Sequence, residues 1–279
     1  MKRLAPIFDV AICVALFWVV RKFLSVPDTP FIEWQAQNFG RSIVTSSIVF
    51  FVVPSLWLIL RRVPADEARL SAYGAAHDLK VAGRMVSIMI LATLLFPIIE
   101  VLGTSQVDWL GAGILTIGFG TAGLFAFRLA ARIKPARDVS KTIRPFSSTS
   151  LALLIGMGAI FLLHDFSAIA SRVLVMVLFV GFLEEYFFRG ILQSRLNACF
   201  GRPWSVWGVQ FGAGLVITAV LFGLFHPLSS SAPFPWPWAV WTGATGIVFG
   251  LVREKTGSVL ASALVHGGIL IPAALFVPA

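Results

Sequence analysis

Three ionisable side chains lie in the otherwise apolar segment 181–190, which reads Gly-Phe-Leu-Glu-Glu-Tyr-Phe-Phe-Arg-Gly. Ionisable residues at membrane depth are energetically costly and are by default a functional hypothesis. On a helix, Glu185 and Arg189 are four residues apart and can pair, whereas Glu184 is rotated by about 100° from Glu185. The pattern leaves one carboxylate available as a general base. A structural ion cluster between helices is the alternative.

Two histidines follow in apolar surroundings. His226 comes one helical turn after Phe222, on the same face, and Pro227 follows it directly. His266 lies in Leu-Val-His-Gly-Gly, where a neutral imidazole in an apolar segment needs a polar partner. For His226, a position at the membrane interface beside a loop is the structural alternative.

Together these motifs resemble the CPBP family, which comprises type II CAAX prenyl proteases and bacteriocin-processing or immunity proteins. The resemblance is carried by Glu184-Glu185-x-x-x-Arg189, by Phe222-x-x-x-His226 and by a histidine that follows Thr-Gly-Ser-Val-Leu at 256–260. It covers roughly residues 170–275. The double-glutamate motif is the most specific element, and the order and spacing of all three strengthen the resemblance.

The resemblance implies proteolysis within the membrane. Glu184 would be the general base that activates water, and His226 would help to bind or orient that water. His266 would stabilise the oxyanion or share in holding a metal, while Glu185 and Arg189 would maintain the site. Two histidines and a glutamate also fit a zinc site, so zinc is a candidate cofactor whose role is left open.

One position departs from the family pattern. Asn or Asp usually stands four residues after the third-motif histidine, and this chain has Leu270 there. A side-chain donor to the oxyanion is therefore missing. The backbone amides of Gly267 and Gly268, or the Ser262 hydroxyl one turn earlier, are alternatives. A family member that binds peptides without cutting them is another.

Composition places these motifs in a membrane protein. Of 279 residues, 58% are hydrophobic and 13% are charged, about half the charged share of an ordinary soluble domain. We predict an all-α, polytopic transmembrane helical bundle with eight or nine spans. They are placed near 7–24, 42–60, 85–103, 109–127, 149–164, 170–190, 206–226, 237–252 and 258–277. Residues 1–145 are expected to form N-terminal helices of unknown role, and residues 146–279 the catalytic core.

Lys and Arg residues concentrate in alternate connections between these spans, as the positive-inside rule expects. The connections after the second, fourth, sixth and eighth spans are predicted to be cytoplasmic, as is the N-terminus. Arg21, Lys22 and Arg41 lie on the wrong side for this rule, so a first helix that lies in the membrane interface is the alternative to a first span. Because the net charge of +9 follows topology, we expect no nucleic-acid partner.

The depth of His226 is a difficulty for a common site. It lies some twenty residues beyond Trp204, which would carry a straight helix nearly across the bilayer. Convergence with Glu184 and His266 requires a break, which we expect at Gly212-x-Gly214. Glycines such as Gly243, and the Gly246-x-x-x-Gly250 spacing, favour close helix packing.

The leading interpretation is an endopeptidase of a prokaryotic cytoplasmic membrane. Its partners would be the lipid bilayer and a peptide or protein substrate in or at the membrane, including lipid-modified ones. A catalytically idle scaffold or immunity protein is the first alternative. A small proton-coupled transporter is the second, but the inverted repeats that would favour it are not found in the sequence.

Overall fold

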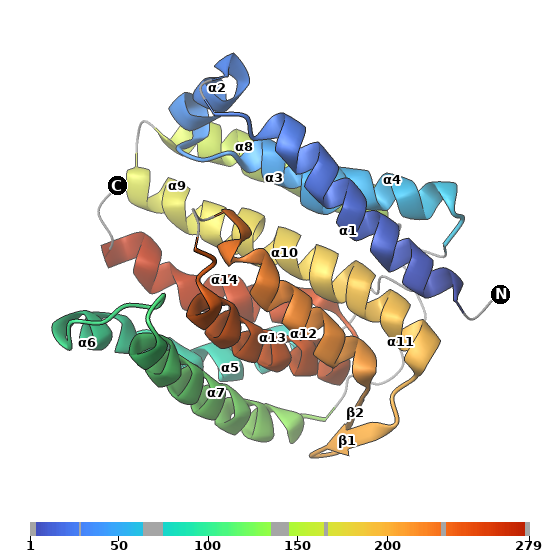
Figure 1. Cartoon of the computed structure of the whole chain (residues 1–279), viewed down its shortest axis with the longest axis vertical. Coiled ribbons are helices and arrows are strands. Elements are labelled where there is room, and N and C mark those ends of the chain that lie inside the picture. Colours follow the sequence, from blue (N-terminus) through green and yellow to red (C-terminus); the bar gives the residue numbers. More distant parts are fainter. Residues whose placement is uncertain are drawn as a thin grey trace.

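The computed structural model describes residues 4–27, 29–63, 75–134, 145–164, 167–229 and 233–276. Its helices lie side by side in three layers (Figure 1). One outer layer holds α1 (Ala5–Leu24), α2 (Pro30–Phe39), α3 (Ile43–Ser47), the π-helical η1 (Ile48–Val52), α4 (Val53–Leu60) and α8 (Pro145–His164). The other holds α5 (Ala75–Ala92), α6 (Leu95–Val101) and α7 (Trp109–Ala131).

The middle layer carries all the candidate site residues. It begins with one unbroken helical stretch made of α9 (Ala168–Leu174), η3 (Val175–Phe182), α10 (Leu183–Glu185), η4 (Tyr186–Gln193) and α11 (Ser194–Phe200). The strands β1 (Trp204–Val206) and β2 (Val209–Phe211), α12 (Ala213–Phe225), the short 3-10 turn η5 (Pro227–Ser229), α13 (Trp236–Thr256) and α14 (Val259–Phe276) follow. The segments η3 and η4 are π-helical, a geometry frequent at functional sites.

The outer layers have the character of a membrane protein. Among the described residues, three helical stretches are long and apolar enough to cross a bilayer: Ile43–Leu60, Ala75–Val101 and Trp109–Ala131. Shorter apolar helices accompany them, and large apolar side chains such as Val101 and Phe23 are exposed. The multi-pass, almost entirely helical fold therefore agrees with the prediction, whereas the count of eight or nine spans is not confirmed.

The seventh span was predicted to begin at residue 206, but a β-hairpin occupies this part of the chain. Residues 204–211 form a two-stranded antiparallel sheet that turns through Trp207 and Gly208, both with positive φ. The helix α12 begins only at Ala213, after the extended Gly212. A Cβ atom on Gly212 would lie 2.2 Å from the Gly201 carbonyl oxygen, so the chain passes too closely there for a side chain.

This hairpin removes the difficulty over the depth of His226. The expected break at Gly212-x-Gly214 is confirmed, and α12 is 13 residues long, or about 20 Å. The helix that leads to His226 therefore begins seven residues later in the sequence than predicted, and it is shorter by the same amount. His226, at the end of α12, reaches the level of the other site residues.

Glycines bring the helices around the site into close contact. A Cβ atom on Gly223 of α12 would lie 2.3 Å from the Ala239 carbonyl oxygen of α13. Likewise, a Cβ atom on Gly181 of η3 would lie 2.6 Å from the Gly267 nitrogen of α14. Gly246 and Gly250 face α12 at similarly short range, so the close packing predicted from their spacing is confirmed.

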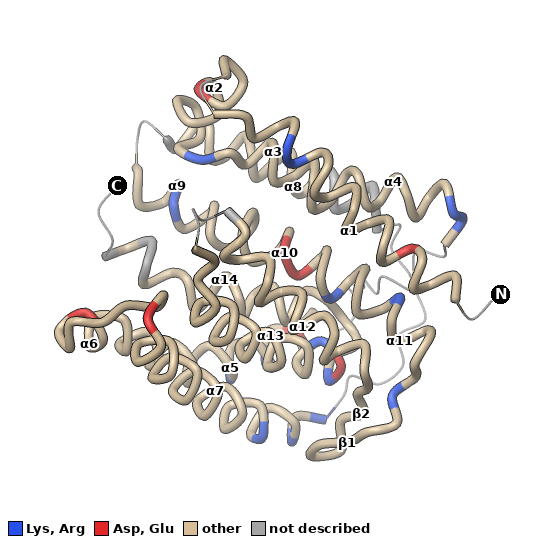
Figure 2. Tube along the Cα trace, in the orientation of Figure 1, with Lys and Arg blue, Asp and Glu red and all other residues tan. Residues whose placement is uncertain are grey.

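One end of the bundle is basic. Lys and Arg gather where α7 and α11 end and where the hairpin lies (Figure 2). At this end Asp9 of α1 contacts Arg61 after α4 at 3.0 Å and Arg195 of α11 at 2.8 Å. The clustering agrees with the predicted alternation of basic connections, and the cytoplasmic orientation of this end stays a prediction.

Candidate active site

The buried part of the site is a three-membered cluster around Glu185. Its Oε2 atom lies 3.3 Å from Arg189 Nε, one turn along the same helix, and its Oε1 atom lies 3.2 Å from His266 Nδ1 of α14. Glu185 and Arg189 are fully buried and His266 nearly so. The predicted pairing of Glu185 with Arg189 is therefore confirmed.

Aromatic rings and a helix carbonyl hold Arg189 in place. Its Nη2 donates to the Gly246 carbonyl oxygen of α13 at 2.9 Å. Its guanidinium carbon lies 4.4 Å from the centre of the Phe222 ring, within cation–π range. Because Gly246 has no side chain, α13 can approach this closely. Arg189 thus joins the helix of the double glutamate to both α12 and α13.

The more open part of the site is a second carboxylate–histidine pair. Glu184 Oε2 and His226 Nε2 lie 3.9 Å apart, and their side chains are 19% and 23% exposed. Among the described residues, Glu184 Oε2 has no hydrogen-bond partner. The separation is too long for a direct hydrogen bond, and the Oε2 atom itself is buried although both side chains are partly exposed.

The end of α12 orients His226. Its backbone N–H donates to the Gly223 carbonyl, three residues back, and its Nδ1 lies 2.7 Å from the Phe222 carbonyl oxygen. A carbonyl oxygen only accepts, so Nδ1 carries a proton. In the neutral imidazole, Nε2 is then the acceptor, and it is Nε2 that faces Glu184.

The structure thus brings together all five residues singled out in the sequence: Glu184, Glu185, Arg189, His226 and His266. Their catalytic roles stay predictions. What the sequence did not show was the pairing of each histidine with a different glutamate.

The groups suggested as substitutes for the missing donor at position 270 have structural roles. The buried Ser262 hydroxyl donates to the Val259 carbonyl oxygen at 3.0 Å. Gly267 faces η3, since a Cβ atom there would lie 2.7 Å from the Val177 Cα atom. Gly268 faces Val86 of α5. Helix packing therefore explains why small residues stand at positions 262, 267 and 268, and no role in binding an oxyanion is needed to explain them.

Zinc at this site stays a prediction. In the described part of the chain, no group of three or more His, Cys, Asp and Glu side chains is placed to hold a metal ion. The two histidines contact different carboxylates instead.

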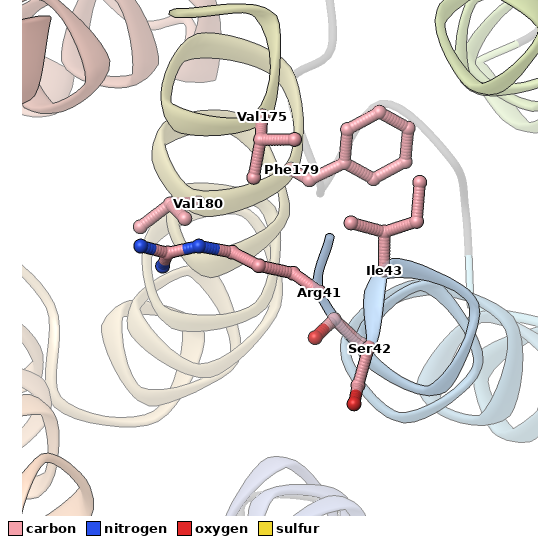
Figure 3. Close-up of a pocket in the computed structure, with 7 residues that line it drawn as sticks. Arg41, Ser42, Ile43, Val175, Phe179 and Val180 are labelled. Carbon is pink, nitrogen blue, oxygen red and sulfur yellow. The ribbon is translucent and has the colours of Figure 1, made fainter. Parts of the chain in front are cut away.

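A pocket of about 410 Å³ lies beside the helix that carries Glu184. It is lined by the start of α3 and by η3, and the Arg41 side chain reaches across it toward Val180 (Figure 3). Its lining residues are Arg41, Ser42, Ile43, Ser46, Val175, Phe179 and Val180. Because Val180 precedes Glu184 by four residues, the pocket and Glu184 are about one helical turn apart along the helix.

Fold and site together define a multi-pass membrane protein with a glutamate–histidine centre between its inner helices. Residues 166–271 match the family model described as type II CAAX prenyl endopeptidase, Rce1-like. The match confirms, for this segment, the family resemblance that the three motifs indicated. Neither the curated proteins nor the solved structures gave a match to the chain. All five site residues lie in the matched segment, and α1–α8 lie outside it.

Proposed function

We propose that the protein is an intramembrane endopeptidase that hydrolyses peptide bonds of membrane-associated or lipid-modified substrates. The observation that carries the proposal is the division of the site into two carboxylate–histidine pairs. The buried Glu185 carboxylate contacts Arg189 and His266. Glu184 and His226 face each other at a partly exposed position. Ionisable side chains held at membrane depth are costly, which favours a functional role.

The open pair suits a hydrolytic water molecule. A water between the two groups would donate one hydrogen to the Glu184 carboxylate and the other to His226 Nε2. Its lone pair would then point away from both groups, toward a substrate carbonyl. Holding the water in this orientation contributes to the rate through proximity, and Glu184 contributes as a general base.

The reaction then follows in two steps. The water oxygen forms a bond to the carbonyl carbon while Glu184 takes a proton from the water, and the carbonyl oxygen becomes an oxyanion. The C–N bond next breaks as Glu184 returns that proton to the leaving nitrogen. The products are a carboxylic acid and an amine, and Glu184 is again a carboxylate.

The surroundings of the site suit a substrate in the bilayer. Apart from Arg41 and two serines, the pocket beside η3 is lined by apolar side chains, and its volume lies in the range of ligand pockets. It would take apolar groups of a substrate whose scissile bond lies at Glu184. The family match, whose description names prenyl endopeptidases, supports a lipid-modified peptide.

A comparison of peptides in membranes tests the proposal. Membranes that contain the parent protein should accumulate defined peptide products, and membranes that contain Glu184→Gln at the same level should not. Identical peptide patterns in the two preparations, from a folded parent, would contradict the assignment and favour a scaffold that binds without cutting.

A further inference from the structure

The helix α1 runs antiparallel to the helix that carries the site, in a fixed register. Asp9 contacts Arg195 at 2.8 Å. Eight residues further along α1, the Phe17 ring lies 5.5 Å from the ring of Phe187, which precedes Arg195 by eight residues. The same register, continued by four residues in each helix from Phe17 and Phe187, brings Arg21 to about the level of residues 183 and 184.

Aromatic packing also joins this part of α1 to the end of α12. The Phe17 and Trp18 rings lie 4.9 Å and 5.2 Å from the Phe225 ring, and Phe225 directly precedes His226. The Arg21 guanidinium carbon lies 5.8 Å from each of these two α1 rings. Such packing restricts a guanidinium and leaves its edge available for hydrogen bonds.

Arg21 therefore lies on the side of α1 that packs on the end of α12, next to His226. It is partly buried, and its charge interacts electrostatically with the Glu184 carboxylate. Its neighbour Lys22 is exposed. In the sequence, Arg21 stood out only as a basic residue on the wrong side for the positive-inside rule. Its electrostatic interaction with Glu184 gives this residue a reason to lie in an apolar helix.

The proposed reaction gains from a hydrogen-bond donor at this place. The oxyanion that forms when water adds to a carbonyl is stabilised by donors aimed at it, and each donor is typically worth about a hundredfold or more in rate. Position 270 is leucine, the Ser262 hydroxyl donates to Val259, and Gly267 packs on η3. These groups are therefore not the missing donor, and the Nδ1 atom of His266, the residue that the resemblance suggests for the oxyanion, lies 3.2 Å from Glu185 instead.

We propose that Arg21 is a further catalytic residue, whose guanidinium donates hydrogen bonds to the oxyanion formed at the Glu184–His226 pair. The inference rests on the proposed function. It assigns to the N-terminal helices, which lie outside the family match, a direct part in the chemistry. A guanidinium has five donors in a planar fork and keeps its charge, so it can bind the oxyanion without a proton transfer.

The test uses the purified full-length protein in detergent and an internally quenched, farnesylated peptide with a CAAX C-terminus. Arg21→Gln should lower kcat by about a hundredfold with little change in KM, because the oxyanion exists only after water has added. Arg21→Lys, which keeps the charge, should recover part of the loss. Lys22→Gln removes the same charge one residue away and should match the parent.

A second measurement needs no substrate. Hydrophobic carbodiimides label protonated carboxyl groups in membranes, and removal of a neighbouring cation favours the protonated form. Labelling of Glu184, measured by mass spectrometry, should therefore rise several-fold in Arg21→Gln and stay unchanged in Lys22→Gln. Equal labelling in all three proteins would overturn the placement of Arg21 beside Glu184.

Other outcomes separate this inference from the proposed function. An unchanged kcat in Arg21→Gln, or a raised KM with kcat retained, would overturn the role in the oxyanion while the peptidase stands, provided that Glu184→Gln is inactive. If Glu184→Gln turns over the peptide as fast as the parent, the proposed function itself fails. Melting temperatures of the variants show whether a loss of activity reflects unfolding.

Discussion

Glu184 and Glu185 are adjacent in the chain, yet their carboxylates contact different histidines on different helices. Glu185 lies 3.2 Å from His266 of α14, and Glu184 lies 3.9 Å from His226 at the end of α12. The rotation of about 100° between neighbouring helical residues produces this separation. The pair of Glu185 and His266 is buried, and Arg189 also contacts Glu185. The pair of Glu184 and His226 is partly exposed. The roles of the two carboxylates should therefore be separable by mutation.

The first prediction concerns the stability of the buried cluster. Glu185→Gln leaves the fully buried Arg189 guanidinium without its carboxylate, a type of change that costs about 3–5 kcal/mol in soluble proteins. We expect the melting temperature of the detergent-solubilised protein to fall by several degrees. Glu184→Gln, at a partly exposed position, should change it little. Equal melting temperatures for the two variants would contradict the division of the site.

A second prediction concerns the orientation of the bundle. Val107 lies in the connection between α6 and α7, and Ser205 lies in the hairpin at the basic end; both are exposed. If basic connections are cytoplasmic, single cysteines at these two positions should label from opposite sides of the membrane. The background would replace Cys13 and Cys199. Labelling from the same side would show that the predicted topology between them is wrong.

The third prediction uses an ion cluster at the basic end, beyond the predicted eighth span. Glu254 accepts hydrogen bonds from Gln193 at 2.6 Å, from Asn197 at 2.7 Å and from Arg202 at 2.6 Å. Burial of Glu254 raises the pKa of its carboxyl. The charges of Arg253 and Arg202, together with the hydrogen bonds from Arg202 and Gln193, outweigh burial, and the pKa lies below its usual value of 4.5.

A lowered pKa in the folded state fixes the sign of the pH effect. The contribution of Glu254 to the free energy of unfolding is fully present above about pH 4.5, and it is lost as the pH falls through the folded pKa. We therefore expect Glu254→Gln to destabilise the protein at pH 7. The difference in melting temperature from the parent should shrink as the pH is lowered below 4. A constant difference down to pH 3 would contradict the account.

The fourth prediction concerns Leu270. It lies one turn beyond His266 on α14 and is partly buried. An Asn there could donate to the oxyanion, and its effect should depend on what already fills that role. With Arg21 as the donor, Leu270→Asn should change the parent little and should raise the turnover of Arg21→Gln. Collapse of parent turnover in a folded Leu270→Asn would mean that Leu270 packs against the substrate.

Local spacing made part of this site predictable from the sequence. The pairing of Glu185 with Arg189 follows from helix geometry, and the break before α12 follows from Gly212 together with the depth that His226 had to reach. The starting residue of α12 was not predictable, because an apolar stretch with Trp204 and Val206 fits a hairpin as well as a helix. Which carboxylate each histidine contacts depends on how α12 and α14 pack on the long helix. The spacing of residues within one helix does not specify this packing.

The role of Arg21 shows a different limit. Its distance from Glu184 in sequence is large, and only the register of α1 against the long helix brings the two together. The available signal was its disagreement with the charge rule for the first span. A basic residue that violates topology within an apolar helix is a candidate site residue.

The most direct test of the account is hydrolysis of the farnesylated CAAX peptide in water enriched in oxygen-18, by the parent and by Glu184→Gln. Because the attacking oxygen comes from water, the parent should place one heavy oxygen atom in the new carboxyl group of the product. Glu184→Gln, with an unchanged melting temperature, should form no product above the uncatalysed background. Labelled product formed by Glu184→Gln at the rate of the parent would contradict the claim that Glu184 activates the water.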